Sequence, residues 1–375
     1  MAPLNRWLRP LLALLLLLLS AAARAGVLTV EVLDVGQGDS ILITSPGGRR
    51  VLIDAGIRGA DVVGQLRARG VDGLDLVIAT HPHADHIGGM ADVLRGLPVR
   101  FYTDNGLPHT TRTYAAVMDA VEEEAITYRP ARRGQSYALD DGARIEVLFP
   151  DGRPLRNTRS DLNSNSVVVR LTHGDDCFLF VGDAEDPTER VLLREGIEPC
   201  DVLKVAHHGS AHSTSAAWLR AVQPSIAVVS VGADNRYGHP DGETLARLES
   251  AGATVFRTDR DGTILLESDG ERIVVTTHVT PHDAPAAASS LAKARLRRAA
   301  METVRRAAPR GPGTGARGDA GSAGARPDDA HPDDARPDDA HPDHADDTAT
   351  TAPGSAARSA ADVPTDGEST DGEST

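Results

Sequence analysis

Short runs of aliphatic and β-branched residues alternate with amphipathic stretches along most of the chain. The short runs are bounded by Gly, Pro, Asn and Asp, which is typical of strands separated by turns. They predict strands over residues 27–33, 40–44, 50–54, 74–80, 99–102, 136–139, 144–149, 166–171, 177–181, 202–206, 226–231, 254–257, 263–266 and 272–276. The amphipathic stretches predict helices over residues 61–69, 86–95, 111–125, 186–195, 213–222 and 242–250. The alternation gives two similar strand-rich halves with flanking helices, and it predicts a layered α/β domain.

The N-terminal segment, residues 1–25, differs from the rest of the chain. Arg6 and Arg9 precede an apolar run over Leu11–Leu19, and Ala23-Arg24-Ala25 ends the segment. A basic start, a short apolar core and an A-x-A site describe a secretory signal peptide, so we expect export to the periplasm or the extracellular space. The apolar core is short for a bilayer span, which makes an uncleaved membrane anchor the less favoured interpretation.

Two further segments follow the globular region, which we place at residues 26–281. Residues 282–307 carry Lys and Arg among alanines and predict a basic helical stretch. Residues 308–375 are rich in Pro, Gly, Ala and Asp and cannot bury enough apolar surface to fold, so they predict a disordered acidic tail. Most of the formal net charge of -15 belongs to this tail. The tail could fold back on the basic stretch or mimic a nucleic acid, and the sequence does not decide between the two.

The densest set of chemically active residues directly follows the apolar run at residues 74–80. His81, His83, Asp85 and His86 fall within six positions, ahead of two glycines. Imidazoles and a carboxylate suit zinc or manganese, and His81 and His83, two apart on an extended segment, face the same side. Asp85 and His86 begin the next turn and could face a second ion. A solvated His-rich turn is the alternative, but a buried strand that delivers these residues favours a metal site.

The stretch His81-Pro82-His83-Ala84-Asp85-His86 resembles the HxHxDH signature of the metallo-β-lactamase fold. Five further segments, in this order and spacing, resemble the hydrolase domain of ComEC-type DNA-uptake proteins over about residues 27–278. The segments are Asp34–Ser40, Leu52–Gly56, Phe180–Asp183, Asp201–Ser210 and Tyr237–Pro240. The resemblance implies a four-layer αβ/βα sandwich whose site lies along one edge of the paired sheets. It also implies a hydrolase that uses one or two metal ions.

The same resemblance assigns roles to individual residues. Asp183 matches the carboxylate that bridges two ions, and Asp54 matches an Asp that supports the metal loop from behind. His207 matches the last histidine of the family pattern, with His208 beside it. One of this pair is expected to be a ligand and the other a proton donor or a supporting group, and we favour His207 as the ligand. The expected metal ligands are His81, His83, Asp85, His86, Asp183 and His207.

One position departs from the general family pattern. Many two-metal members carry a further histidine just before the strand that precedes the bridging Asp, and this chain has Asn163 and Asn165 there. ComEC-type domains resemble this chain in having Asn-Ser at that point. An amide oxygen is a harder ligand than an imidazole. We therefore expect two divalent ions, zinc or manganese, with manganese favoured at the first site.

The resemblance implies metal-assisted hydrolysis, in which a hydroxide held between the ions attacks a phosphorus centre. Asp85, His208 and His239 are expected to take part in the reaction. Three more residues in the matched segments could lie beside the site or hold the phosphate: Asp39, Lys204 and Ser210. Lys204 lies on a predicted buried strand and could instead extend its ammonium to solvent. Asp39 could equally belong to a plain tight turn.

The chain has two cysteines, Cys177 and Cys200. Each precedes a predicted site residue at a similar distance along its strand, so the two sulfurs could start from neighbouring strand ends. In an exported protein such a pair could form a disulfide. Two small buried apolar residues are the alternative, and the sequence leaves both open.

These observations predict an exported metal-dependent phosphodiesterase, and the resemblance to ComEC-type domains implies a nuclease acting on DNA. No stretch other than the N-terminal one is apolar enough to cross a membrane, so no integral membrane channel is expected in this chain. Aromatic residues make up only 3% of the chain, which offers little surface for stacking bases. The alternatives are a hydrolase of another ester, of the phosphorylcholine or lactone type, and a module that binds nucleic acid without cutting it. The oligomeric state is not predicted.

Overall fold

The computed structural model describes residues 26–278, which form two sheets. The first sheet has eight strands in the order β15-β14-β1-β2-β3-β4-β5-β6, and the second has seven in the order β13-β12-β11-β10-β9-β8-β7. The strands of the first sheet are β1 (Leu28–Val32), β2 (Ile41–Thr44), β3 (Arg50–Ile53), β4 (Leu76–Ile78), β5 (Phe101–Thr103), β6 (Thr127–Tyr128), β14 (Ile264–Ser268) and β15 (Ile273–Thr277). Those of the second sheet are β7 (Ser136–Ala138), β8 (Arg144–Phe149), β9 (Val168–His173), β10 (Asp176–Phe180), β11 (Val202–Lys204), β12 (Ile226–Val229) and β13 (Thr254–Arg257).

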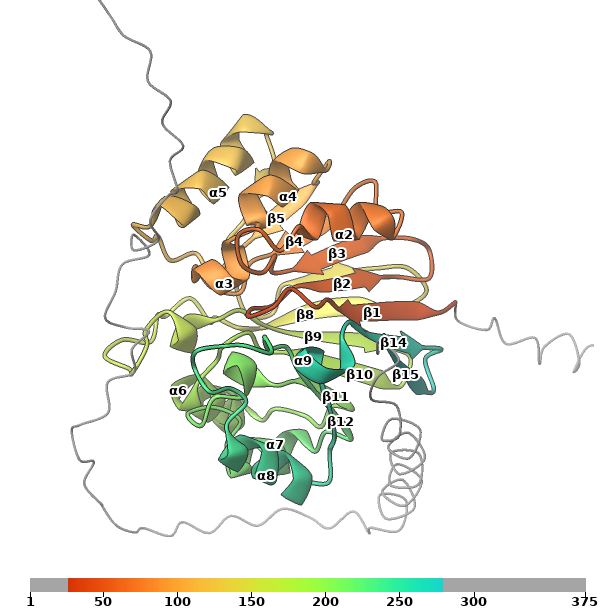
Figure 1. Cartoon of the computed structure of the whole chain (residues 1–375), viewed down its shortest axis with the longest axis vertical. Coiled ribbons are helices and arrows are strands. Elements are labelled where there is room, and N and C mark those ends of the chain that lie inside the picture. The colour runs from red at the N-terminus through yellow and green to blue at the C-terminus, as the bar shows by residue number, and fades with distance from the viewer. Residues whose placement is uncertain (1–25, 279–375) are drawn as a thin grey trace, which may run out of the picture. The chain divides into compact units, whose positions relative to one another are not determined.

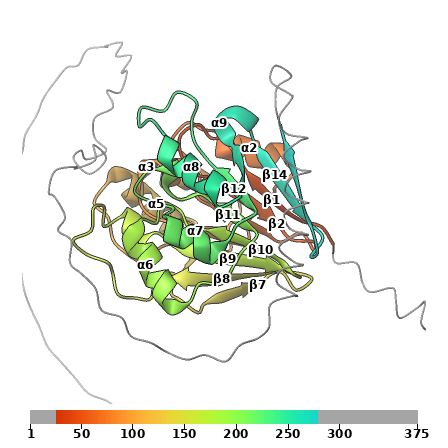
Figure 2. The ribbon, with the colours of Figure 1, turned by 90° about the horizontal axis from the view of Figure 1, so that it is seen from below.

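Helices cover the outer face of each sheet (Figures 1 and 2). One set follows the strands of the first sheet: α2 (Val62–Ala68), α3 (Ala84–Ile87), α4 (Met90–Gly96) and α5 (Arg112–Glu123). The other set is α6 (Asp186–Glu195), α7 (Ala216–Val222) and α8 (Gly242–Ser250), with the short α9 (Thr258–Asp261) after β13. Alternating residues of both sheets, such as Val30, Val169 and Phe180, form one core between the sheets. One further core lies between the first sheet and its helices, and another lies between the second sheet and its helices. The predicted four-layer αβ/βα sandwich is confirmed.

Two predicted elements differ from the structure at the places where the chain approaches the site. The helix expected over residues 86–95 is split into α3 and α4 at Gly88-Gly89. A Cβ atom on Gly88 would lie 2.4 Å from the Arg58 nitrogen, and one on Gly89 would lie 2.5 Å from the Ala55 carbonyl oxygen. The chain needs glycine there to pack against the loop after β3. The strand predicted to reach Ala206 ends at Lys204, and a 3₁₀ turn over Ala206–Gly209 follows.

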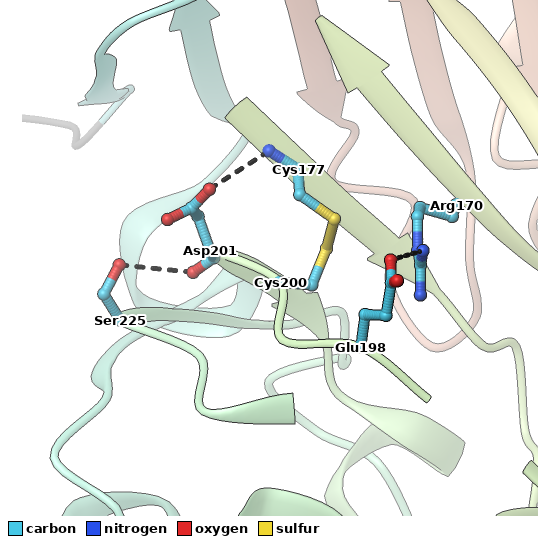
Figure 3. Close-up of a disulfide and its surroundings, with 6 residues drawn as sticks. All are labelled: Arg170, Cys177, Glu198, Cys200, Asp201 and Ser225. Atoms are coloured by element: carbon cyan, nitrogen blue, oxygen red, sulfur yellow. Dashed lines mark hydrogen bonds and ion pairs between the residues drawn. A yellow bond between two sulfur atoms is a disulfide. The ribbon is translucent and has the colours of Figure 1, made fainter. Parts of the chain in front are cut away.

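Cys177 and Cys200 form a disulfide, with Cα atoms 5.0 Å apart (Figure 3). Cys177 lies in β10 and Cys200 precedes β11, and these two strands pair in parallel with Phe178 opposite Val202. The Cys177 N–H also donates to a carboxylate oxygen of Asp201 at 3.1 Å. Parallel pairing therefore brings the two sulfurs together, and of the two alternatives that the sequence left open the structure has the disulfide.

The predicted signal peptide, the basic stretch and the acidic tail lie outside the described residues. Within residues 26–278 no helix has the length and apolar character that a membrane crossing requires.

Candidate metal centre

The site lies where several strands and loops end at one edge of the sandwich. His81–His86 follow β4, Asp183 follows β10, and His207 and His208 follow β11. Strands β10 and β11 run parallel, so the segments after them meet at the same edge of the second sheet. The side chains that gather here are Asp39, Asp54, His81, His83, Asp85, His86, Asp183, His207 and His208.

Four of these residues, Asp85, His86, Asp183 and His208, place donor atoms within 4.8 Å of one another. His208 Nε2 lies 3.1 Å from Asp85 Oδ2 and 3.6 Å from Asp183 Oδ2, and His86 Nε2 lies 3.2 Å from Asp183 Oδ1. Both His86 Nε2 and Asp183 Oδ1 are buried and make no hydrogen bond. A buried imidazole nitrogen and a buried carboxylate oxygen that face each other without a hydrogen bond suit a shared divalent cation.

Asp54 holds the ring of His86 from behind. Its Oδ2 accepts the His86 Nδ1–H at 2.8 Å and the Thr80 hydroxyl at 2.7 Å, and its Oδ1 accepts the Thr80 N–H at 2.7 Å. A histidine that donates through Nδ1 presents the lone pair of Nε2. Asp54, which we expect to support the metal loop, hydrogen-bonds two residues of that loop, Thr80 and His86.

A buried ion pair lies behind His208. Lys204 Nζ is 2.6 Å from Asp39 Oδ2, and both side chains are 1% exposed. The other Asp39 oxygen lies 3.5 Å from His208 Nδ1, which donates to the Ser230 carbonyl at 2.9 Å. The alternative in which Lys204 extends to solvent is therefore wrong, because its ammonium is buried and pairs with Asp39. Asp39 lies beside the site rather than in a plain surface turn.

His81 and His83 lie together on one side of the loop, as their spacing predicts. His81 Nε2 is 3.0 Å from His83 Nδ1 and 3.8 Å from Asp183 Oδ2. Asn163 reaches the same region: its amide nitrogen is 3.4 Å from His207 Nε2, and its Oδ1 is buried without a hydrogen bond. Asn165 does not reach it, because its amide is hydrogen-bonded to the Leu155 backbone at 2.9 Å in both directions.

His207 and His208 are not extended, because both adopt left-handed backbone angles with φ of 48° and 52°. Both rings therefore face Asp183 instead of pointing apart. His208 belongs to the compact four-donor group, whereas His207 lies between Asp183 Oδ2 at 3.7 Å and Glu185 Oε1 at 3.4 Å. Sequence analysis missed Glu185, although its place two residues after Asp183 on an extended segment was a usable signal.

His239 and Ser210 lie at different depths. The His239 ring is 5.6 Å from that of His207 and stacks on Tyr237 at 5.9 Å, which places it at the rim of the cluster. Ser210 is buried, and its hydroxyl accepts the His212 N–H at 3.4 Å while its carbonyl accepts the Thr244 hydroxyl at 2.9 Å. Ser210 thus stabilises the turn after the two histidines.

The charges of the cluster shift the protonation of its members. Burial disfavours a charged His208, but Asp183 and hydrogen bonds to Asp39 and Asp85 raise the pKa of His208 to about 10. Burial alone would raise the pKa of Asp183, yet His86, His208 and His207 hold the pKa of this carboxyl well below its usual range. Asp183 therefore stays ionised and draws positive charge into the cluster.

Comparison with known proteins agrees with this geometry. The family model of the metallo-beta-lactamase superfamily matches residues 33–233, and the chain belongs to that superfamily. ComE operon protein 3 of Bacillus subtilis (strain 168) is 31% identical over 258 residues, which cover 63% of this chain and 32% of that protein. Competence protein ComA of Neisseria gonorrhoeae is 32% identical over 240 residues, which cover 63% of this chain and 31% of that protein.

A Ribonuclease Z of Mycobacterium avium (strain 104) is also similar, at 31% identity over 160 residues, covering 35% of this chain and 55% of that protein. The chain spans about a third of the length of the two competence-type relatives that it matches. The predicted resemblance to ComEC-type proteins is confirmed.

Proposed function

We propose that this protein is an exported metal-dependent phosphodiesterase, a nuclease whose substrate is DNA. The observation that carries the proposal is the compact group of Asp85, His86, Asp183 and His208, in which the buried His86 Nε2 and Asp183 Oδ1 face each other at 3.2 Å and neither makes a hydrogen bond. A carboxylate-rich set of this kind suits a hard divalent ion. Membership of a superfamily of metal-dependent hydrolases supports the same chemistry.

Two divalent ions, zinc or manganese, are proposed. The second ion would be held by Asp85, His86, Asp183 and His208, and the first by His81, His83, Asp183 and the Asn163 oxygen. Asp183 is proposed to serve both, because its Oδ1 lies 3.2 Å from His86 of the second set and its Oδ2 lies 3.8 Å from His81 of the first. When bound, such ions make a water nucleophilic at neutral pH and stabilise negative charge on phosphoryl oxygens.

Other residues of the chain are proposed to orient the ligand rings and the substrate and to supply a proton. Asp54 and the Ser230 carbonyl fix the rings of His86 and His208 so that Nε2 of each faces the cluster. His239, at the rim, is proposed to give a proton to the leaving oxygen. His207, beside Glu185, is proposed to orient substrate rather than to bind metal, which revises the preference drawn from the sequence. Lys204 is proposed to neutralise Asp39.

Two lines support the choice of DNA and of export. Relatives named for competence point to DNA, and a relative named Ribonuclease Z points to the phosphodiester bonds of RNA as the nearest alternative. The pattern of residues 1–25 and the Cys177–Cys200 disulfide suit an oxidising compartment.

The test is cleavage of plasmid DNA, single-stranded DNA and RNA by the protein after metal stripping and re-addition of manganese or zinc. The proposal predicts metal-dependent cutting of DNA that Asp183→Asn abolishes. Binding of DNA without cutting under either metal would favour a binding module. Hydrolysis of small esters alone would favour a different esterase.

A paired substitution tests the choice between the two adjacent histidines. His208→Ala is expected to lower both metal affinity and activity, because Nε2 of His208 belongs to the four-donor group. His207→Ala is expected to raise KM with metal content unchanged. The opposite pattern would make His207 the ligand.

A further inference from the structure

A groove with a volume of about 560 Å³ lies beside the metal centre. One wall is α6, and the other is the loop that leads from β8 to the 3₁₀ turn at Asn163–Asn165. The two walls lie on the same side of the molecule in both ribbon views (Figures 1 and 2). The groove therefore combines a rigid helix face with a loop that begins at the site.

The groove is basic, although the chain as a whole carries a formal net charge of -15. Its lining holds four arginines and two acidic residues: Arg156, Arg159, Arg190, Arg194, Glu185 and Asp186. Arg190 is 61% exposed and lies 3.9 Å from Asp186, a distance at which an exposed pair binds weakly. Arg194 follows one helical turn later, about 6 Å along the axis. A row of exposed guanidinium groups at this spacing suits a chain of phosphates.

The inner end of the groove touches the site. Glu185 is buried, and its Oε1 lies 3.4 Å from His207 Nδ1, while His207 Nε2 lies 3.7 Å from Asp183. Arg159 approaches the same carboxylate, with Nε 3.7 Å from Oε1, and this Nε is buried without a hydrogen bond. The Glu185 carboxylate thus lies between the buried donor of Arg159 and the ring of His207.

Hydrogen bonds hold the loop wall in place. Asn165, which does not reach the metal centre, fixes the Leu155 backbone through both its amide oxygen and its amide nitrogen. Asp161 accepts the N–H and the hydroxyl of Thr158, each at 2.8 Å. The arginines of this wall are therefore carried by an ordered segment, and the pair of asparagines has two distinct tasks.

The arginine cluster that follows β6 is a weaker candidate. Arg133 pairs with Glu195 at 2.9 Å and donates to the Leu148 carbonyl. Arg132 donates to the Ala131 carbonyl at 2.6 Å. These guanidinium groups are engaged in holding their own loop.

We propose that the groove binds the backbone phosphates of a single nucleic-acid strand on one side of the bond that is cut. The inference rests on the proposed function and adds that the substrate is a polymer gripped over several nucleotides. Glu185 repels phosphate from the inner end, so the strand would pass it on the arginine side.

The test compares the double variant Arg190→Gln/Arg194→Gln with the control Arg220→Gln on the exposed face of α7, using the full chain loaded with manganese. Both arginines of α6 are exposed, so the double variant is expected to keep the wild-type melting temperature. The substrates are a single-stranded DNA oligonucleotide and bis(p-nitrophenyl) phosphate. The second is too small to extend from the metal centre to the arginines of the groove. Binding of the oligonucleotide is measured as well, by fluorescence anisotropy over a range of salt concentrations.

The double variant is expected to lose at least about tenfold in oligonucleotide affinity and in kcat/KM, and its salt slope is expected to fall by roughly 1.4, at 0.7 per lost contact. Hydrolysis of bis(p-nitrophenyl) phosphate is expected to stay unchanged, and Arg220→Gln to behave as wild type. Equal oligonucleotide binding by wild type and double variant would overturn the proposal that the groove binds backbone phosphates. A wild type that hydrolyses neither substrate would instead overturn the proposed function, while the binding data would still decide on the groove.

Discussion

Strands β9 and β10 connect two buried clusters of histidine and aspartate that differ in the number of carboxylates around one imidazole. At the far end His173 Nδ1 donates to the Ser268 hydroxyl at 2.8 Å, and that hydroxyl donates to Asp176 Oδ2 at 2.8 Å. At the near end His86 Nε2 and Asp183 Oδ1 lie 3.2 Å apart with no hydrogen bond. Asp176 and Asp183 are seven residues apart, or roughly 20 Å along an extended chain.

The difference distinguishes a structural cluster from a binding site. Residue composition alone would not distinguish the two, because both contain histidine and aspartate. The far cluster has one carboxylate for one imidazole and a hydroxyl between them, and it links the two sheets because Ser268 belongs to β14. The near cluster brings four aspartates around one histidine, His86: Asp39, Asp54, Asp85 and Asp183. Lys204 offsets Asp39, and the other carboxylates have to be balanced by a further cation, whether a proton or a metal.

The largest expected effect comes from Asp183→Asn. The substitution removes a charge and an acceptor from the near cluster, so hydrolysis of DNA is expected to fall to the uncatalysed background. The free energy of unfolding of the metal-free protein, measured in urea, is expected to fall as well, because the ionised Asp183 stabilises the protonated His208 beside it. Substantial residual activity would mean that Asp183 does not hold the ions.

Removing the disulfide perturbs the far end instead. The bond spans a sequence separation of 23 residues, so Cys177→Ser/Cys200→Ser is expected to lower the free energy of unfolding by about 3 kcal/mol. Activity per folded molecule is expected to be unchanged, because the bond lies near Asp176 rather than Asp183. Unfolding in urea and DNA cleavage, measured on the same preparation, check both parts. A matching loss of activity would mean that the disulfide also supports the metal centre.

Glu189 provides a buried carboxylate that belongs to neither cluster. Burial, offset in part by N–H donors from Ser215 and Thr214, raises the pKa of Glu189 to about 7 from its ordinary 4.5. The folded pKa exceeds the unfolded one, so the contribution to stability is present below about pH 4.5 and is lost as pH rises through about 7. Glu189→Gln is expected to remove a loss of about 3 kcal/mol that wild type shows between about pH 4 and pH 8. Parallel pH curves for the two proteins would rule this out.

A matched pair removes one hydrogen bond from each cluster. Asp54→Asn weakens the support of His86 and is expected to cost about 10–100-fold in metal affinity or activity. Ser268→Ala leaves His173 and Asp176 without their shared hydroxyl and is expected to cost about 1–3 kcal/mol of stability with activity retained. If Ser268→Ala lowered activity as much as Asp54→Asn, the two clusters would not be separable in function.

Much of the fold and the members of the near cluster could be predicted from the sequence, because apolar periodicity and the HPHADH stretch are local signals. The split of the helix at Gly88-Gly89 could not, since it depends on the loop after β3 that packs against those glycines. The partner of Lys204 was also hidden, because Asp39 lies 165 positions away and only the folded chain brings the charges together. The left-handed backbone at His207 and His208, which turns both rings toward Asp183, could not be predicted either.

The most direct test of the account is equilibrium binding of manganese to the metal-stripped protein, with Asp183→Asn and Ser268→Ala measured beside wild type. The account predicts two ions per chain for wild type and for Ser268→Ala, and loss of tight binding in Asp183→Asn. Wild-type affinity and stoichiometry in Asp183→Asn, or no binding by wild type, would contradict it.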